Sequence, residues 1–288
     1  MTARGLAHGG RPVTRAVAFA AVMAVPILIV VVPISGFFAM SFWHVEGQKI
    51  VRDWSFANYE AFFSSPAYWL TFLYTLELCL EVTAIGLAVG YPVAYFIWKR
   101  RGRLRYALLL LFVMPLFMSY IVKIYTMRSI LGLDGLLNRS LVASGILQAP
   151  SLVFLYNRPA ILITMAVIFL PFVILPIFLS LERIPGNLIQ ASADLGAGAG
   201  TTFRHIVLPL SLPGTLAGAL FAFVLALGDF ITPQMVGGPS GFTFGRVIWS
   251  QFGLAYNWPF GSALGVVLFL IALLAILVGG WAAGRQRV

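Results

Sequence analysis

Charged residues are scarce in this chain. Only 10% of its 288 residues are Asp, Glu, Lys or Arg, whereas 60% are hydrophobic and the mean hydropathy is +0.96. A water-soluble domain could not cover its surface with so few polar side chains. The composition therefore predicts a membrane protein that has lipid as its main solvent.

Cysteine and histidine are also rare, which excludes several kinds of site. The single cysteine, Cys79, cannot form a disulfide within the chain, and the three histidines are far apart in sequence. No Cys/His cluster has the spacing of a metal site. No histidine lies near an intramembrane carboxylate in sequence, as a membrane enzyme with a nucleophile and a base would need. We expect no metal, no cofactor and no catalytic residue on this chain.

Positive charge exceeds negative charge by ten. The basic residues separate apolar runs and do not gather on one polar face, which is typical of membrane proteins and not of nucleic-acid-binding proteins. We therefore expect membrane lipid, and no nucleic acid, among the partners.

Long apolar runs are abundant, and six of them are close to the roughly 20 residues that a helix needs to cross a bilayer. They cover residues 16–42, 69–98, 106–127, 160–181, 212–228 and 261–283. Backbone polar groups in lipid must pair within a segment, and the runs show no strand alternation. The sequence predicts an all-α membrane protein with six transmembrane helices. The first run is too long for a signal peptide, so we interpret it as a retained helix.

Prolines interrupt the second, third and fourth runs. Pro92, Pro115, Pro171 and Pro176 lie inside them. Proline removes a backbone donor and disturbs a helix, so we expect kinks at these places.

The distribution of Lys and Arg predicts the orientation. If the N-terminus is cytoplasmic, the inside segments hold 12 basic residues and the outside segments hold six. The positive-inside rule then places both termini in the cytoplasm. The predicted parts are a tail at 1–15, a transmembrane domain at 16–283 with an inside loop at 182–211, and a second tail at 284–288.

The inside loop contains a polar, glycine-rich stretch, QASADLGAGAGTTFRHIVLPLSLPG, from Gln190 to Gly214. A phosphate-binding loop is one hypothesis, but no strand precedes the glycines and no Gly-Lys-Ser/Thr follows them. A flexible connector is a second hypothesis. A third is a docking piece, because residues 187–195 and 201–209 can each form a short amphipathic helix with glycines between them.

The spacing within this stretch resembles the EAA signature of permease subunits of binding-protein-dependent ABC importers. That signature is Glu-Ala-Ala, three residues, Gly, nine residues and Ile-x-Leu-Pro, and it falls here on Gln190, Ala191, Ser192, Gly196, Ile206, Leu208 and Pro209. The resemblance implies the type I ABC importer permease fold, with a cytoplasmic coupling helix that docks on an ATPase subunit. Gln190 and Ser192 depart from the signature. Because Gln cannot form a charge-assisted pair, we expect docking to depend more on Asp194, Arg204 and apolar packing.

Other segments resemble the first permease subunit of the spermidine/putrescine group. They include LAVGYPVAYFIWK, VKIYTMRSILGLDGLLN and GRVIWSQFGLAYNWPFGSALG. The resemblance implies a bacterial inner membrane location, a second permease subunit in a heterodimer, a cytoplasmic ABC ATPase dimer that holds ATP and Mg, and a periplasmic or extracellular substrate-binding protein. The implied substrate is a polyamine, and another small organic solute is the alternative. A stand-alone secondary transporter or channel would need internal repeats or a selectivity filter, and the sequence contains no convincing example of either.

A polyamine pathway needs carboxylates and aromatic faces. The second run contains Tyr74, Glu77 and Glu81 one helical turn apart, and Asp229 follows the fifth run. We expect these four residues to line the pathway. The alternative is pairing inside the membrane, with Lys123 of the third run as the partner of a glutamate.

Overall fold

The computed structural model describes residues 19, 22–47 and 49–284. The predicted tail at 1–15 lies outside these residues, as do residues 16–18 and 20–21 of the first predicted span. Of the predicted C-terminal tail, only Gly284 is described. The elements are η1 (Ile27–Val31), α2 (Val32–Met40), β1 (His44–Glu46), β2 (Lys49–Val51), α3 (Ala57–Ser64), α4 (Pro66–Lys99), α5 (Arg103–Val113), η2 (Met114–Phe117), α6 (Tyr120–Leu131), α7 (Leu136–Ala143), η3 (Leu152–Phe154), α8 (Arg158–Glu182), α9 (Gly186–Asp194), α10 (Ala199–Thr202), η4 (Phe203–Val207), α11 (Leu208–Gly228), α12 (Ile231–Val236), η5 (Gly238–Gly241), α13 (Phe244–Gly253) and α14 (Trp258–Gly284).

The protein is an all-helical membrane protein apart from one small ribbon. Among the described residues, five helices are long and apolar enough to cross a bilayer, and a bent pair of helices makes a sixth candidate. The ribbon pairs β1 with β2 in antiparallel register, with Val45 opposite Ile50. These β-branched residues favour strands, and Gly47 supplies the positive φ of 64° beside the turn. Hydropathy alone gives no sign of so short a ribbon.

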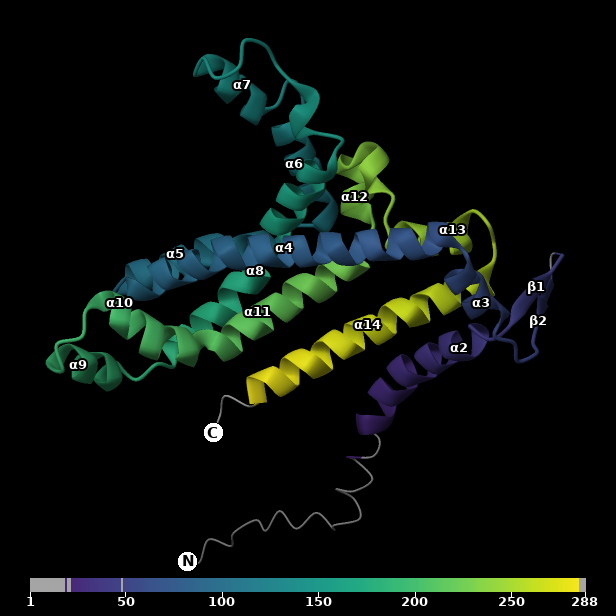
Figure 1. Cartoon of the computed structure of the whole chain (residues 1–288), viewed down its shortest axis with the longest axis horizontal. Helices are drawn as coiled ribbons and strands as arrows, with labels where there is room; N and C mark the ends of the chain where they lie inside the picture. The colour runs from purple at the N-terminus through teal and green to yellow at the C-terminus, as the bar shows by residue number, and fades with distance from the viewer. Residues whose placement is uncertain (1–18, 20–21, 48, 285–288) are drawn as a thin grey trace, which may run out of the picture.

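Residues 106–127 do not form one continuous helix, and the kink expected at Pro115 is a sharp bend. α5 gives way to the 3₁₀ turn η2, which contains Pro115, and α6 begins at Tyr120 after a bend of 104°. Pro115 lacks a backbone N–H and cannot continue the α-helical hydrogen bonds. Met118 and Ser119 are extended, so the chain changes direction there. Figure 1 shows the result: α6 and α7 rise away from the long helices.

The fifth spanning helix begins earlier than hydropathy predicts. Residues Ala199–Gly228 form one helix of 30 residues, although only 212–228 were expected to span. The polar residues at the beginning continue the same helical path through a π-helical turn, η4. About half of the predicted inside loop is therefore the first part of this long helix.

α8 is the central helix and packs between α4 and α11. Glycines allow the close approach on both sides of Val173 in α8. A Cβ atom on Gly90 of α4 would lie 2.8 Å from Val173 Cγ1, and one on Gly218 of α11 would lie 3.0 Å from the Val173 carbonyl oxygen. Small residues at helix interfaces are typical of membrane proteins, because packing there must drive association without water.

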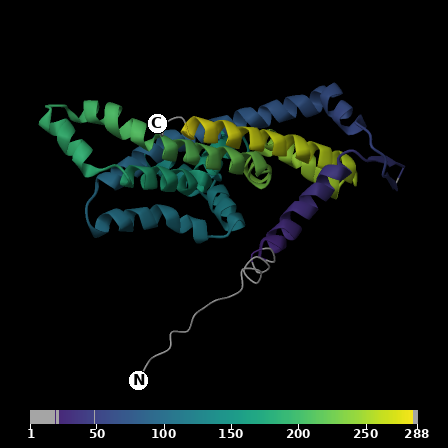
Figure 2. The same ribbon diagram turned by 90° about the horizontal axis from the view of Figure 1, so that it is seen from below.

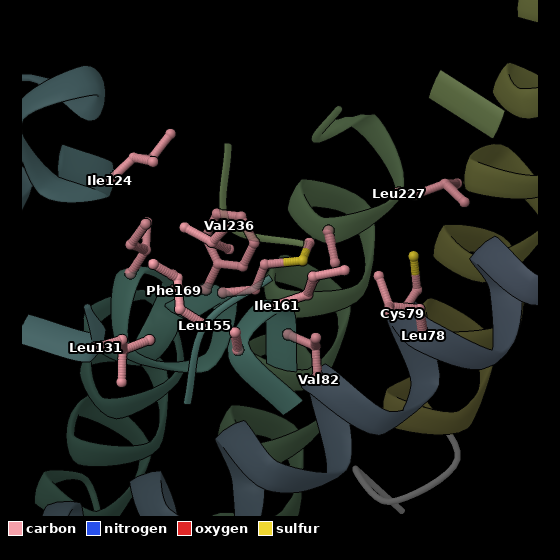
Figure 3. Packing of buried hydrophobic residues seen from close by; sticks show 14 residues of the cluster. Leu78, Cys79, Val82, Ile124, Leu131, Leu155, Ile161, Phe169, Leu227 and Val236 are labelled. Atoms are coloured by element: carbon pink, nitrogen blue, oxygen red, sulfur yellow. The ribbon is translucent and has the colours of Figure 1, made fainter. Parts of the chain in front are cut away.

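Buried apolar side chains join the helices near the C-terminal end of α11. Leu78 and Val82 from α4, Ile124 from α6, Phe169 from α8 and Leu227 from α11 belong to one cluster, whose buried residues are drawn in Figure 3. A second cluster joins α4, α8 and η4 at the opposite end. The two clusters hold α11 at both of its ends.

α14 packs beside α11 and carries α2 on its other side. Figure 2 shows α2 diverging from the bundle, and none of the side chains in its spanning window is buried. The bundle of α4, α8, α11 and α14 therefore positions the two regions described next, one at each end of α11 (Figure 1).

Candidate coupling loop and substrate pathway

The segment that follows α8 is a short helix closed by a glycine. α9 ends at Asp194, and Gly196 has a φ of 77°. The N–H of Gly196 donates to the carbonyl of Ala193, and the N–H of Ala197 donates to the carbonyl of Ser192. This pair of bonds is the Schellman motif, in which glycine takes the left-handed conformation that a side chain disfavours. Gly196 therefore ends the helix and turns the chain.

Ser192, one of the two departures from the EAA signature, has a clear role. Its side chain is buried, and its Oγ lies 2.8 Å from Oγ1 of Thr202 in α10. An alanine at this position could not make that hydrogen bond. The serine therefore connects the two arms of the turn.

The other predicted residues of this segment differ in their exposure. Gln190, Ala191 and Asp194 on α9 are exposed, as are Arg204 and Pro209, whereas Ile206 and Leu208 are partly buried. Leu195, which was not among the predicted site residues, is 88% exposed at the end of α9. It is one of the most exposed large apolar side chains in the described part of the chain. Its apolar character in a polar stretch was the only signal in the sequence.

Aromatic contacts fasten this segment to the bundle. The ring of Phe203 lies 5.2 Å from the ring of Tyr95 and 6.0 Å from that of Tyr91, both in α4. The hydroxyl of Tyr91 lies 2.8 Å from Oγ of Ser211. At about 1.5 Å per residue, the helix from Ala199 to Gly228 is about 45 Å long. The turn at Gly196 and Asp229 therefore lie near opposite ends of one long helix.

At the other end of the bundle, Glu77 and Glu81 share one cation. Nη2 of Arg158 lies 2.9 Å from Oε1 of Glu77 and 2.9 Å from Oε1 of Glu81, and Nε donates to Oε2 of Glu81 at 3.2 Å. The hypothesis that Lys123 pairs with a glutamate is wrong. Nζ of Lys123 lies 5.6 Å from the ring centre of Tyr120, and Lys123 forms no ion pair with any carboxylate in the described part of the chain.

Tyr74 completes this group, which we call the Arg158 cluster (Tyr74, Glu77, Glu81 and Arg158). The guanidinium carbon lies 5.3 Å from the centre of the Tyr74 ring, and the Tyr74 hydroxyl donates to the carbonyl of Ser240. The side chains of Glu77, Glu81 and Arg158 are 59%, 39% and 31% exposed. Two carboxylates and one guanidinium leave one net negative charge on an accessible surface. Arg158 was missed because it belongs to a segment expected to lie outside the membrane.

Asp229 is placed apart from this cluster. Its Oδ1 accepts the backbone N–H groups of Ile231 and Thr232, so it caps α12, and its Oδ2 accepts the hydroxyl of Tyr120. Asp229 and Tyr120 line a hollow of about 330 Å³ together with Phe169 and other apolar residues. The structure therefore brings three of the four predicted pathway residues together and puts the fourth in a separate aromatic hollow.

Metal binding is not supported by this arrangement. In the described ranges, no three His, Cys, Asp or Glu side chains are grouped so that they could hold a metal ion.

Comparison with known proteins gives a consistent family. Residues 13–285 match the family described as binding-protein-dependent transport system inner membrane component. The spermidine/putrescine transport system permease protein PotB of Haemophilus influenzae is 36% identical over 221 residues, which is 77% of each chain. PotB of Escherichia coli is 34% identical over 76% of this chain and 79% of its own length. The inner membrane ABC transporter permease protein YdcU of Escherichia coli is 36% identical over 78% of this chain and 75% of its own.

Solved structures show the same fold. A bacterial alginate ABC transporter in complex with a pentasaccharide-bound periplasmic protein contains a chain that matches with a TM-score of 0.71 and 17% identity, over 93% of both chains. A chain of the inward-facing MetNI methionine ABC transporter matches with a TM-score of 0.58 and 18% identity, over 74% of this chain and 93% of its own. The arrangement of helices expected for a type I importer permease is thus confirmed.

Proposed function

The chain belongs to the family of binding-protein-dependent transport system inner membrane components, and on this premise we propose that it forms half of the pathway through which an ATP-driven importer admits a polyamine. Membership in this family makes the chain a transport subunit of the inner membrane and not an enzyme. The relatives named for spermidine/putrescine transport are 34% and 36% identical, which supports this substrate class.

The partners follow from the same proposal. A second permease subunit completes the pathway as a heterodimer, a cytoplasmic ATPase dimer binds the coupling loop (residues 186–207), and a binding protein delivers substrate to the outer face. Both termini then lie in the cytoplasm. The greater number of Lys and Arg residues in the inside segments supports this orientation.

The observation that carries the substrate proposal is the hollow at Asp229. An ammonium group that leaves water needs a carboxylate and aromatic faces around it. Asp229, Tyr120, Phe169 and Phe230 provide these groups in one place, and the hollow of about 330 Å³ is large enough for an aminoalkyl chain. Because Asp229 follows α11 directly, a shift of that helix alters the hollow.

The Arg158 cluster has a second role in the proposal. Arg158 contacts two carboxylates and the face of Tyr74, which are the groups that a substrate ammonium would contact. The cluster retains one negative charge, so it attracts cations toward the outer mouth of the pathway. An amine that reaches Glu77 or Glu81 competes with the guanidinium for the same oxygens.

The long helix Ala199–Gly228 would couple ATP hydrolysis to the pathway. The ATPase would hold the coupling loop, and closure of the ATPase dimer would move the loop as a rigid body. Phe203 and Ser211 transmit this movement to α4, and the helix transmits it to Asp229. Substrate loading and ATP binding would then shift the population between inward-facing and outward-facing arrangements.

Another small organic solute is the alternative within the same importer class. The alternative would leave the coupling loop unchanged and would make Asp229 only a cap for α12. A stand-alone transporter or channel is not compatible with the family.

The experiment that tests the substrate proposal replaces Asp229 with asparagine. Asparagine can still cap α12, so the variant removes the charge and keeps the fold. We expect uptake of radiolabelled spermidine into vesicles that contain the whole importer to fall about 10-fold or more, because a charge-assisted contact contributes about 1.5–3 kcal/mol.

Glu60→Gln is the matched control, because Glu60 is an exposed carboxylate on α3 on the same outer side. It should leave uptake unchanged. Native uptake by the Asp229→Asn importer, at equal amounts of assembled complex, would contradict the assignment of Asp229 to the pathway.

A further inference from the structure

A large pocket lies beside the coupling loop, at the opposite end of the bundle from Asp229. It has a volume of about 740 Å³ and is bounded by the end of α4, the beginning of α5, α9 and α10. Four of its lining residues are basic and one, Glu182, is acidic; the basic ones are Lys99, Arg100, Arg101 and Arg105. The pocket therefore has an excess of three positive charges, which the substrate pathway does not use.

Arg105 is the most buried of these cations. Its side chain is 19% exposed, and its guanidinium carbon lies 4.9 Å from the centre of the Phe178 ring. Nη2 lies 3.4 Å from Oε1 of Glu182, an oxygen that already accepts the hydroxyl of Tyr106. Nε of Arg105 is buried and has no hydrogen-bond partner among the described residues, and the buried Nη2 has only the ion-pair contact with Glu182. Buried donors of this kind need an acceptor, and the pocket is where one would fit.

The beginning of α5 adds further donors at the same wall. Gly102 precedes the helix with a φ of 65°, and no described side chain caps the first turn. That turn contains Arg103 and Arg105 and no acidic residue. Positive side chains at a helix N-terminus are unfavourable beside the helix dipole, unless an anion binds there.

Aromatic residues indicate how deep the pocket lies. Tyr95, Trp98 and Tyr106 line it, and Nζ of Lys99 lies 4.7 Å from the centre of the Tyr95 ring. Aromatic and basic residues together are typical of the level of lipid headgroups. The orientation proposed above places this level in the cytoplasmic leaflet, which is rich in anionic lipid.

We infer that this pocket binds a phosphate group, either in the headgroup of an anionic phospholipid or as free phosphate. Arg105 would donate from Nε and Nη2 to the phosphate oxygens, and Lys99, Arg100 and Arg101 would balance its charge. Ile189 and Ala193 of α9 also line the pocket. A bound phosphate therefore connects the coupling loop to α4 and α5 and stabilises its position.

The test uses the complete importer in nanodiscs and follows the midpoint of its thermal unfolding. One set of nanodiscs is pure phosphatidylcholine, a second contains added phosphatidylglycerol, and a third is pure phosphatidylcholine with inorganic phosphate in the buffer. We expect phosphatidylglycerol or inorganic phosphate to raise the midpoint of the native importer, because a ligand that binds the folded state stabilises it.

Two variants identify the pocket. Arg105→Gln removes the buried donors, and it should require about 10-fold more phosphatidylglycerol or phosphate for the same rise. Arg101→Gln removes an exposed charge of the same pocket with little effect on folding. This variant therefore tests the pocket even if Arg105→Gln is unstable. Arg139→Gln, an exposed arginine on α7 at the other end, is the control and should respond as the native importer does.

The outcomes separate the two sources. A rise with phosphatidylglycerol alone identifies the lipid headgroup, and a rise with inorganic phosphate in neutral nanodiscs identifies free phosphate. An equal response of the native importer and both pocket variants would overturn the proposal. The absence of any rise in the native importer would overturn it as well.

Discussion

Replacing Leu195 with aspartate is expected to abolish stimulation of the ATPase by the loaded binding protein. Leu195 is 88% exposed at the end of α9, beside the turn at Gly196. If this side chain is buried in a cleft of the ATPase subunit, its burial contributes about 1.5–3 kcal/mol. Aspartate would lose this favourable free energy of burial and would add the free-energy cost of burying a charge. We therefore expect the affinity between permease and ATPase to fall at least about 100-fold.

The measurement is ATPase activity of the reconstituted importer, together with the amount of ATPase subunit that purifies with the permease. Ile146→Asp is the matched control, because Ile146 is 70% exposed on the other side of the membrane in the proposed orientation. The control should keep both properties. A Leu195→Asp importer with native stimulation would show that the docking contact lies elsewhere on the coupling loop.

Replacing Arg158 with glutamine is expected to destabilise the importer, and neutralising both glutamates should reverse the loss. Without the guanidinium, Glu77 and Glu81 are two like charges one helical turn apart. Because all three side chains are partly exposed, we expect a loss of about 1–2 kcal/mol rather than that of a fully buried pair. The triple variant Arg158→Gln, Glu77→Gln, Glu81→Gln removes the repulsion and should recover the thermal stability of the native complex.

Uptake distinguishes the two roles of this cluster. If the glutamates attract the substrate, the triple variant is stable but takes up spermidine several-fold more slowly, and the difference shrinks at high salt because of screening. A stable triple variant with native uptake would mean that Arg158 and the glutamates only hold α4 and α8 together.

Hydropathy was sufficient to predict the spanning helices, because backbone polar groups in lipid must form hydrogen bonds within their own segment. It could not predict the break at Met118 or the early beginning of the fifth helix at Ala199. These two features depend on hydrogen bonds and packing, and not on the fraction of apolar residues in a stretch of sequence. Pro115 correctly predicted a break in the helix, but the presence of a proline does not determine the angle of the bend.

The turn after α9 was easier to predict than the contacts of the carboxylates. The positive φ of Gly196 follows from its place after a short helix, so a local pattern was enough. The partner of Glu77 and Glu81 is Arg158, which lies 77 residues beyond Glu81. The sequence has no periodicity that relates them, and only the packing of α8 against α4 brings them together. For the same reason, the contact of Asp229 with Tyr120 could not be predicted.

The most direct test of the proposed function is ATPase activity of the reconstituted importer with its binding protein, with and without spermidine, putrescine and a panel of neutral and anionic solutes. We predict stimulation by the polyamines, and loss of uptake of the same polyamines in the Asp229→Asn importer. Stimulation only by neutral or anionic solutes would contradict the polyamine assignment. It would also leave Asp229, Glu77 and Glu81 as structural residues of an importer for another substrate.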